Sequence, residues 1–374
     1  MKQVTTILAI LVGFTMNAQL GPVTENLKTG QRLTVSNTSN HGDIGTSAVD
    51  LSYSNSTSTT RGATGNYSIS MGYETTASGL YSTAMGYLTT ASDRYCTAMG
   101  DRTTASGWYS TAMGGETTAS GNNSVAMGYQ TTASAFNSIA MGQNTTASGD
   151  ISTAMGHQTT ASGELSTAMG NGTTASDFAS LTIGLYNSVN STETSNGSAY
   201  SFDTDNAAFV IGNGTASNAL SDAFVVRFNG DATLSGDLTI NSDERLKDNI
   251  QPLGSTLNKL HQIEAKTYSL KKDEEHTPKI GVLAQEVQLV FPELVTEGAD
   301  GILSVNYQGL VPVLINAINE QEVKMSEQDA KIAALEAQNE QLAIASQKIA
   351  ALEEMVRFLA LQQSQSTSFL QAGL

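Results

Sequence analysis

The sequence predicts a mainly β protein: a parallel β-roll (a solenoid) continued by a β-rich stalk, then a small α+β domain and a C-terminal parallel coiled coil. Three observations predict this architecture: a strict 14-residue repeat, a shortage of helix formers within that repeat, and an abrupt change of composition at Ser242. Aromatic residues make up 6% and charged residues 14% of the 374 residues, both low for a globular enzyme. The net charge of −17 argues against nucleic-acid partners, because phosphate binding needs clustered Lys and Arg.

Residues 1–18 are predicted to form a secretory signal peptide. Lys2 gives the positive start, residues 4–14 form a mostly apolar core, and Ala18 is a small residue before the expected cut. The apolar run is too short to span a bilayer. We therefore expect an exported protein, extracellular or on a cell surface, with no transmembrane segment in the mature chain. Residues 19–61 form an N-terminal segment to which the sequence assigns no structure.

The repeat covers residues 62–185. Methionine recurs every 14 residues from Met71 to Met169, Gly follows each one, and Ile183 takes the next place. A Thr-Thr-Ala-Ser block recurs at the same period. Gly and paired Thr in every period oppose a helix and favour short strands joined by tight turns. Each unit is thus one coil with two short strands, and nine coils stacked at about 4.8 Å would form a rod of about 40 Å.

The repeat also predicts which side chains face inward. Neighbouring side chains of a strand point to opposite faces, so Ala84 and Met85 cannot share one. We predict that the small alanines fill a narrow interior and that the methionines face outward onto other copies of the chain. An alanine interior buries little apolar area, whereas burial of a Met column contributes roughly 1.5–3 kcal/mol per side chain. This favours a homotrimer, although the period alone does not fix the number of chains.

Residues 123–128 read Asn-Ser-Val-Ala-Met-Gly. This motif, at its 14-residue period, resembles the head repeat of the trimeric autotransporter adhesins over about residues 62–185. The resemblance implies a trimeric left-handed parallel β-roll with an adhesive or spacer role. Cys96, the single cysteine, stands in the column of Ser82 and Ser110. We interpret Cys96 as a neutral replacement of Ser; the alternative is a reactive or trimer-bridging thiol.

The remainder of the chain divides into four parts. Residues 186–241 are predicted to be the β-rich stalk, with short strands near 209–212, 223–226 and 234–240. Helical and strand patterns alternate over residues 242–318, which predicts the small α+β domain. Residues 319–362 fit an a/d heptad pattern with one break of phase, typical of a coiled coil with one stammer. Residues 363–374 are expected to be a flexible tail.

The opening of the α+β domain carries a motif of its own. Residues 242–250 read Ser-Asp-Glu-Arg-Leu-Lys-Asp-Asn-Ile, and two further motif blocks lie at 280–287 and 305–314. In this order the blocks resemble the endosialidase-type intramolecular chaperone and autoprotease domain that ends phage tail fibres and tailspikes, over about residues 242–320. The resemblance implies an intramolecular chaperone that directs assembly and then cuts itself off.

The resemblance also assigns the site residues. Ser242 is expected to be the nucleophile, Lys247 the general base, and Asn241–Ser242 the scissile bond. A free lysine, with a pKa near 10.4, is a poor base at neutral pH. Burial on assembly would lower that pKa, so that Lys247 takes the Ser242 proton only after folding. The competing interpretation is that Ser242 only caps a helix, for example as its N-cap, and that Lys247 is solvated.

These patterns predict a secreted or cell-surface homotrimeric fibre, adhesin-like or tail-fibre-like, with single-turnover Ser–Lys autoproteolysis as its only catalytic activity. The expected partners are its own copies and a host-surface, matrix or glycan ligand. No cofactor or metal site is expected, since the four histidines are scattered. The alternative is a glycan- or ice-binding β-solenoid, with the exposed Thr pairs as the binding array and a trimerisation domain that does not cleave. A glycan-degrading tailspike is not favoured, because the repeat holds few acidic residues.

Overall fold

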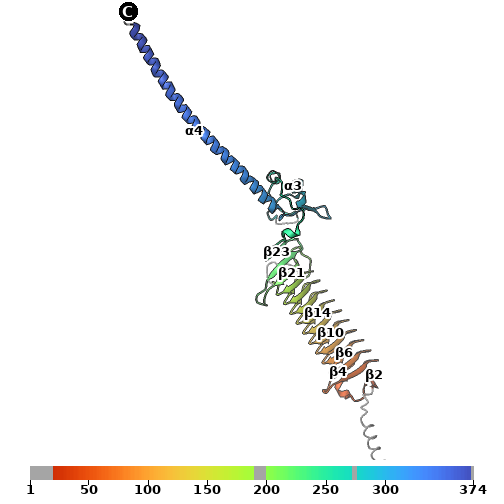
Figure 1. Ribbon diagram of the computed structural model, residues 1–374. Helices are drawn as coiled ribbons and strands as arrows, with labels where there is room; N and C mark the ends of the chain where they lie inside the picture. The colour runs from red at the N-terminus through yellow and green to blue at the C-terminus, as the bar shows by residue number, and fades with distance from the viewer. Residues whose placement is uncertain (1–19, 189–198, 272–275, 372–374) are drawn as a thin grey trace, which may run out of the picture. The chain divides into compact units, whose positions relative to one another are not determined.

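The computed structural model describes residues 20–188, 199–271 and 276–371, with side chains described up to residue 364 (Figure 1). The predicted signal peptide lies outside the described residues. The chain divides between Ile240 and Asn241 into two compact units. This division falls one residue before the change of composition seen in the sequence.

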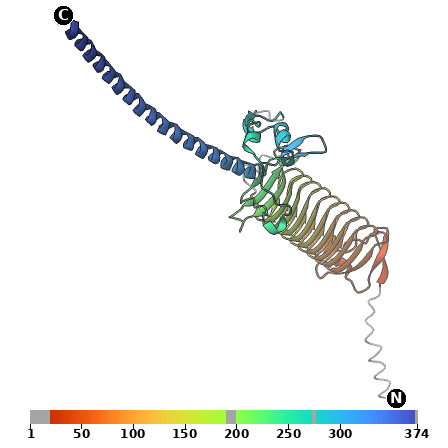
Figure 2. The ribbon, with the colours of Figure 1, turned by 45° about the horizontal axis from the view of Figure 1, so that its top comes forward.

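The first unit is the β-solenoid that the repeat predicts, and Figure 2 shows its stacked coils. One strand of each coil joins a long sheet, whose members in spatial order are β1 (Leu20–Glu25), β2 (Lys28–Leu33), β3 (Val49–Tyr53), β4 (Ile69–Tyr73), β6 (Thr83–Tyr87), β8 (Thr97–Asp101), β10 (Thr111–Gly115), β12 (Val125–Tyr129), β14 (Ile139–Gln143), β16 (Thr153–His157), β18 (Thr167–Asn171), β20 (Leu181–Leu185), β21 (Ala207–Asn213), β22 (Asp222–Arg227) and β23 (Ala232–Leu234).

A second sheet lines the other side of the coils and is made of two-residue strands. Its members are β5 (Thr76–Ala77), β7 (Thr90–Ala91), β9 (Thr104–Ala105), β11 (Thr118–Ala119), β13 (Thr132–Ala133), β15 (Thr146–Ala147), β17 (Thr160–Ala161) and β19 (Thr174–Ala175). Strands from β4 to β20 are parallel and in register, so that Met113 pairs with Met99 on one side and Met127 on the other. Equivalent residues of successive coils therefore form straight columns.

The interior is filled by alanine, as predicted. Ala84 and Ala91, one from each sheet, are fully buried, and the same holds for their equivalents along the solenoid. Met85 points to the opposite face of its strand and remains partly exposed. The predicted orientation of Ala and Met is therefore confirmed within one chain.

Each coil also buries a serine, and Cys96 occupies one position of that column. The Ser82 hydroxyl donates to the Gly79 carbonyl oxygen at 2.7 Å, and the Cys96 thiol makes the same contact with the Asp93 carbonyl oxygen at 2.7 Å. Cys96 is fully buried inside the coil, and burial raises the pKa of its thiol to about 11. The geometry fits the interpretation of Cys96 as a serine replacement and leaves no route to a bridging thiol.

Two corners of every coil use left-handed backbone. One corner column contains Tyr109, Asn123, Asn137 and Ile151, with φ between 53° and 58°. Asn adopts this conformation readily, whereas a β-branched residue in it is a conformational outlier. Asn123 and Asn137 also join their side chains through a hydrogen bond of 3.0 Å. Ile151, which is 48% exposed, is β-branched and has no side-chain amide to form such a hydrogen bond.

We therefore expect Ile151→Asn to stabilise the solenoid by about 1 kcal/mol, because left-handed backbone costs a residue with a Cβ about 1–2 kcal/mol and Asn tolerates it better. The midpoint of thermal unfolding, followed by circular dichroism, should rise by about 2–4 °C. Ile139→Asn is the matched control, since Ile139 lies in strand β14 with ordinary backbone. A fall in the midpoint of Ile151→Asn would contradict the expectation.

The N-terminal segment, unassigned from sequence, forms the first part of the solenoid. Strands β1 and β2 make an antiparallel hairpin, and β2 then pairs in parallel with β3. Val49 of β3 pairs with Gln31 of β2 and with Ile69 of β4, at intervals of 18 and 20 residues instead of 14. These longer intervals explain why the period cannot be followed into this segment from the sequence.

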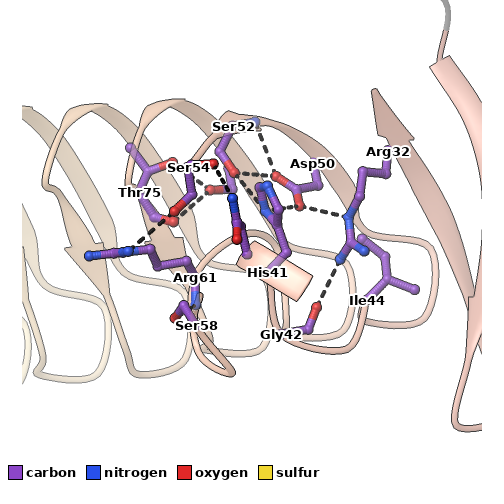
Figure 3. A network of polar contacts seen from close by, with 12 residues as sticks. Arg32, His41, Gly42, Ile44, Asp50, Ser52, Ser54, Ser58, Arg61 and Thr75 are labelled. Carbon is purple, nitrogen blue, oxygen red and sulfur yellow. Dashed lines mark hydrogen bonds and ion pairs between the residues drawn. The ribbon is translucent and has the colours of Figure 1, made fainter. Parts of the chain in front are cut away.

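A buried charged network closes this end of the solenoid (Figure 3). Arg32 is 1% exposed; its guanidinium donates to Asp50 Oδ2 at 3.0 Å, to Glu25 Oε1 at 2.9 Å and to the Gly42 carbonyl oxygen at 2.8 Å. His41 Nδ1 lies 3.1 Å from Asp50 Oδ2. Burial alone would raise the pKa of Asp50, but hydrogen bonds from His41 and Ser52 outweigh it and hold that pKa below its ordinary value of 3.8.

Asp50→Asn should destabilise the solenoid by about 3–5 kcal/mol at neutral pH, because it leaves the buried Arg32 cation without its central partner. Since the folded-state pKa of Asp50 is lowered, its contribution is present above pH 3.8 and is lost as the pH falls through the folded-state value. Unfolding by denaturant at neutral pH and at a pH below 3.8 measures the loss of stability and its dependence on pH. Asp101→Asn, at an exposed ion pair with Arg102, is the control and should change stability by about 0.5 kcal/mol or less. Equal stability of the two variants at neutral pH would count against the network.

The far end of the solenoid turns from parallel to antiparallel pairing. Strand β20 pairs in parallel with β21, and β21, β22 and β23 then pair antiparallel. Asn187 Oδ1 accepts from the Thr174 backbone amide at 2.7 Å, and Asn187 Nδ2 donates to the Thr174 carbonyl oxygen at 2.9 Å. The Asn187 side chain therefore terminates the second sheet. The predicted strand at 234–240 is wrong: β23 ends at Leu234, and the apolar residues beyond it, such as Leu238 at 67% exposure, have no strand to pair with in one chain.

The second unit is small, with a core of Val287, Phe291 and Val313. Its elements are η2 (Glu244–Leu246), α2 (Leu257–Leu260), β24 (Lys266–Tyr268), β25 (Lys279–Gly281), α3 (Ala284–Val290), η3 (Pro292–Leu294), β26 (Val295–Glu297), β27 (Leu303–Val305) and α4 (Leu310–Gln371). Strands β24 and β25 form one antiparallel pair, and β26 and β27 form another.

Helix α4 is 62 residues long and continues past residue 362, where the sequence analysis expects it to end. The predicted flexible tail is thus helical up to Gln371. The physical reason is that no Pro or Gly interrupts the chain between Pro312, in the first turn, and Gly373. None of the helices within the described ranges is long and apolar enough to cross a membrane.

Candidate active site

Ser242 and Lys247 lie on either side of the single turn η2, at the beginning of the second unit. Lys247 Nζ donates a hydrogen bond of 2.7 Å to Ser242 Oγ. Both residues are exposed in one chain, as is Asn241, whose carbonyl carbon precedes Ser242. The structure thus brings together the three residues that the sequence analysis assigns to self-cleavage.

The turn is held by Asp243 and Arg245. Asp243 Oδ1 accepts from the Arg245 amide at 2.9 Å, and the Arg245 guanidinium pairs with both oxygens of that carboxylate. The hydrogen bond from Arg245 holds the pKa of Asp243 below its usual value. The Lys247 amide closes the turn on the Glu244 carbonyl oxygen at 3.0 Å, which returns Lys247 toward Ser242.

The N-cap of the turn is Asp243, so the competing interpretation is wrong in making Ser242 a helix cap, although Lys247 is exposed in one chain, as that interpretation expects. A side-chain oxygen one residue before the turn satisfies its free amide, which leaves the Ser242 hydroxyl available to Lys247. A lysine nitrogen at hydrogen-bond distance from a serine oxygen meets the geometric requirement for a base and its nucleophile. In one chain, however, nothing buries the pair.

The second and third motif blocks pack together in this unit. Tyr307 Oη accepts from the Val282 amide at 3.2 Å. A side chain at Gly281 would lie 2.7 Å from the same Oη, so only glycine fits there without a shift. The Glu286 carboxylate accepts from the Glu264 amide at 3.0 Å and pairs with Lys266 at 3.2 Å, and these contacts lower its pKa. These motif residues hold the domain together and lie apart in sequence from Ser242 and Lys247.

Helix α4 fixes the segment that follows the dyad. The Glu320 carboxylate accepts from the Thr256 amide at 2.6 Å and from the Ser255 hydroxyl at 2.9 Å. The hydrogen bond from the Thr256 amide is the main reason that the pKa of Glu320 lies below its ordinary value. Asn316 donates to Gly254 and Thr256 in the same cluster. No sequence pattern predicts this link, because Glu320 looks like one more surface charge of the coiled coil.

Apolar side chains around the dyad are uncovered. Leu246 is 70% exposed, Ile250 57% and Leu253 46%. Three large apolar side chains close to Ser242 in the sequence are thus left in contact with water. Exposed apolar residues that gather in one place mark surfaces that other chains cover.

In the part of the chain that the structure describes, no group of three or more His, Cys, Asp or Glu side chains is arranged to hold a metal ion. His41 pairs with Asp50, and His157 Nδ1 lies 3.0 Å from Asn171 Oδ1 in the neighbouring coil. These two histidines serve the packing of the solenoid.

Comparison with known families agrees with both resemblances noted in the sequence. Residues 242–296 match the family described as chaperone of endosialidase, and the match begins at Ser242. Six overlapping stretches match the YadA head domain repeat, at residues 63–89, 97–117, 105–131, 133–159, 147–173 and 161–177. The predicted resemblances are therefore confirmed.

Two curated relatives are phage proteins. The long tail fiber protein Gp37 of Escherichia phage AR1 is 37% identical over 97 residues, and that of Enterobacteria phage K3 is 29% identical over 158 residues. The matches cover 24% and 38% of this chain. They span only 9% and 13% of the relatives' own length.

Proposed function

We propose that the chain is an exported, tail-fibre-like adhesin that assembles as a homotrimer and releases its C-terminal chaperone by cutting its own Asn241–Ser242 bond. The observation that carries this proposal is the 2.7 Å contact between Lys247 Nζ and Ser242 Oγ. It lies at the first residue of the chaperone-family match and one residue inside the second unit.

The reaction needs no group beyond the dyad and water. The neutral amine of Lys247 takes the proton of Ser242 Oγ, and that oxygen attacks the carbonyl carbon of Asn241. The bond between this carbon and the Ser242 nitrogen breaks, and the lysine returns its proton to the leaving amine. Water then hydrolyses the ester to a carboxylate at Asn241 and a free hydroxyl at Ser242. One event per molecule suffices, and a rate near 10⁻³ per second corresponds to a barrier of about 21 kcal/mol.

Assembly supplies what one chain lacks at the dyad. Burial favours the neutral form of a lysine, and the exposed apolar residues Leu246, Ile250 and Leu253 provide a surface that neighbouring copies would cover. Cleavage would then follow folding of the trimer. Cleavage at an undiminished rate by a chain held monomeric by dilution would contradict this order of events.

Helix α4 also leaves apolar side chains exposed in one chain, which supports assembly. Its expected a/d residues Ile332, Leu335 and Leu342 are between 51% and 63% exposed, and a lone helix of this length leaves them in water. A parallel coiled coil buries such a seam. Three solenoids of nearly identical coils pair almost as well after a slip of one coil, so a C-terminal clamp that sets the register first would prevent misassembly.

Intact-mass measurement of the purified full chain tests the proposal. Two fragments should appear, one ending at Asn241 and one starting at Ser242. A preparation that is trimeric by light scattering and yet remains uncut would contradict the proposed self-cleavage, while leaving assembly intact.

A further inference from the structure

Four tyrosines form a stacked row along one corner of the solenoid, and we call Tyr67, Tyr81, Tyr95 and Tyr109 the tyrosine ladder. Neighbouring ring centroids lie 4.9, 5.1 and 4.8 Å apart, with interplanar angles of 9° or less. Each residue comes from a successive coil and is between 45% and 56% exposed. The row thus presents one phenol edge per coil to solvent.

The backbone of this corner does not favour tyrosine. All four residues have φ between 55° and 58°, in the left-handed region that costs a residue with a Cβ about 1–2 kcal/mol. The next two coils place Asn123 and Asn137 in the same column with the same backbone. Stacking contributes roughly 0.5–1.5 kcal/mol per aromatic pair and offsets this strain. Phenylalanine would stack equally well, so stacking leaves the exposed hydroxyls without a structural reason.

The column next to the ladder adds an indole and a cation. Trp108 is 47% exposed, and the Arg94 guanidinium lies 5.3 Å from the centre of its ring. The Tyr109 amide donates to the Arg94 carbonyl oxygen at 3.0 Å, so the backbone that carries Arg94 and Trp108 adjoins the backbone of the ladder. Since Asn123 follows Tyr109 in the column, no further ring is stacked on that end. The strip therefore combines aromatic surface, regularly spaced hydroxyls and one guanidinium.

We infer that the tyrosine ladder, with Trp108 and Arg94, binds an extended glycan chain that lies along the solenoid. Phenol hydroxyls both donate and accept hydrogen bonds, as sugar hydroxyls do. The stacked rings cover one another's faces, so the ladder offers its row of hydroxyl-bearing edges and the outer face of the last ring, Tyr109, to the C–H groups of a sugar. The spacing of one phenol per coil is close to the length of one pyranose unit in an extended chain. Because the strip is open rather than enclosed, affinity comes from several units bound together.

This inference gives a ligand class to the proposed adhesin and rests on its extracellular role, not on self-cleavage. The test uses the purified full chain on an array of linear oligosaccharides of increasing length, from disaccharides to decasaccharides. Wild type should bind at least one series, with affinity that rises with length and levels off once the ladder is filled. Binding to no series, or binding that is independent of length, would overturn the inference.

The residues that occupy the same column in the next coils suggest which variants to make. Tyr95→Asn combined with Tyr109→Asn places the residue of the next coils in the ladder, so the fold should be kept while binding weakens about tenfold or more, equivalent to about 1.4 kcal/mol. Tyr95→Phe combined with Tyr109→Phe keeps the stack, removes the hydroxyls and should also weaken binding. Tyr129→Asn is the control, since Tyr129 is similarly exposed, at 45%, but lies outside the ladder.

Two readouts keep the outcomes distinct. Light scattering shows whether the Asn variants change the number of associated chains; if they do, the ladder is a contact between copies and the glycan inference is wrong. Unchanged binding by the Asn variants would also overturn it. Intact mass of the same samples reports cleavage at Asn241. Failure of self-cleavage therefore counts against the proposed function, whereas failure of glycan binding counts against the ladder alone.

Discussion

Ser242→Ala is expected to remain a single uncut chain, whereas wild type separates into fragments that meet between Asn241 and Ser242. Removal of the Oγ atom removes the proposed nucleophile, so cleavage should fall by several orders of magnitude, to the background of peptide hydrolysis. Intact mass and denaturing gels over days after purification measure this. Cleavage of Ser242→Ala at the same bond would show that another group or another protease makes the cut.

Variants of Lys247 test the proposed general base separately from the proposed nucleophile. Lys247→Arg keeps a positive side chain and a hydrogen-bond donor, but a guanidinium does not give up its proton at neutral pH. We expect Lys247→Arg and Lys247→Ala to be equally uncut, and both to assemble like wild type. Lys324→Ala, at an exposed lysine of α4, is the matched control and should cleave normally. Normal cleavage by Lys247→Arg would exclude a proton-accepting role for this side chain.

The repeat could be predicted from the sequence in detail because each of its columns holds one residue type. Strand alternation puts Ala84 and Met85 on opposite faces, and the small size of alanine assigns it to the narrow interior. The N-terminal end could not be predicted, because the pairing of Arg32 with Asp50 joins residues 18 apart that belong to no repeated pattern. Sequence periodicity detects coils of constant length and misses coils with insertions.

The candidate site could likewise be predicted only in part, because its residues stand in a motif but its contacts do not. The motif identifies Ser242 and Lys247, but five residues of separation do not reveal how the two side chains meet. The single turn capped by Asp243 and held by Arg245 supplies that answer. The contact of Glu320 with Thr256 spans 64 residues and carries no local sequence signal.

The second large effect is expected at the glycine that follows each methionine. Gly114 has φ of 121°, a conformation open almost only to glycine, and a Cβ there would lie 2.0 Å from the Gly128 carbonyl oxygen of the next coil. Every coil from Gly72 to Gly184 keeps glycine at this place. Gly114→Ala should therefore force two coils apart and destabilise the solenoid by about 3 kcal/mol or more, which combines backbone strain with steric overlap.

Gly107→Ala is the informative comparison, because distance alone predicts the same clash. A Cβ at Gly107 would lie 2.0 Å from the Gly121 carbonyl oxygen, yet Asp93 and Ala135 occupy equivalent places in the same column. Gly107 also lacks the positive φ of Gly114. If backbone conformation decides, Gly107→Ala should cost about 1 kcal/mol or less, whereas Gly114→Ala lowers the unfolding midpoint by about 6–12 °C. Equal losses in the two variants would mean that the spacing between coils, and not the left-handed backbone, requires glycine after each methionine.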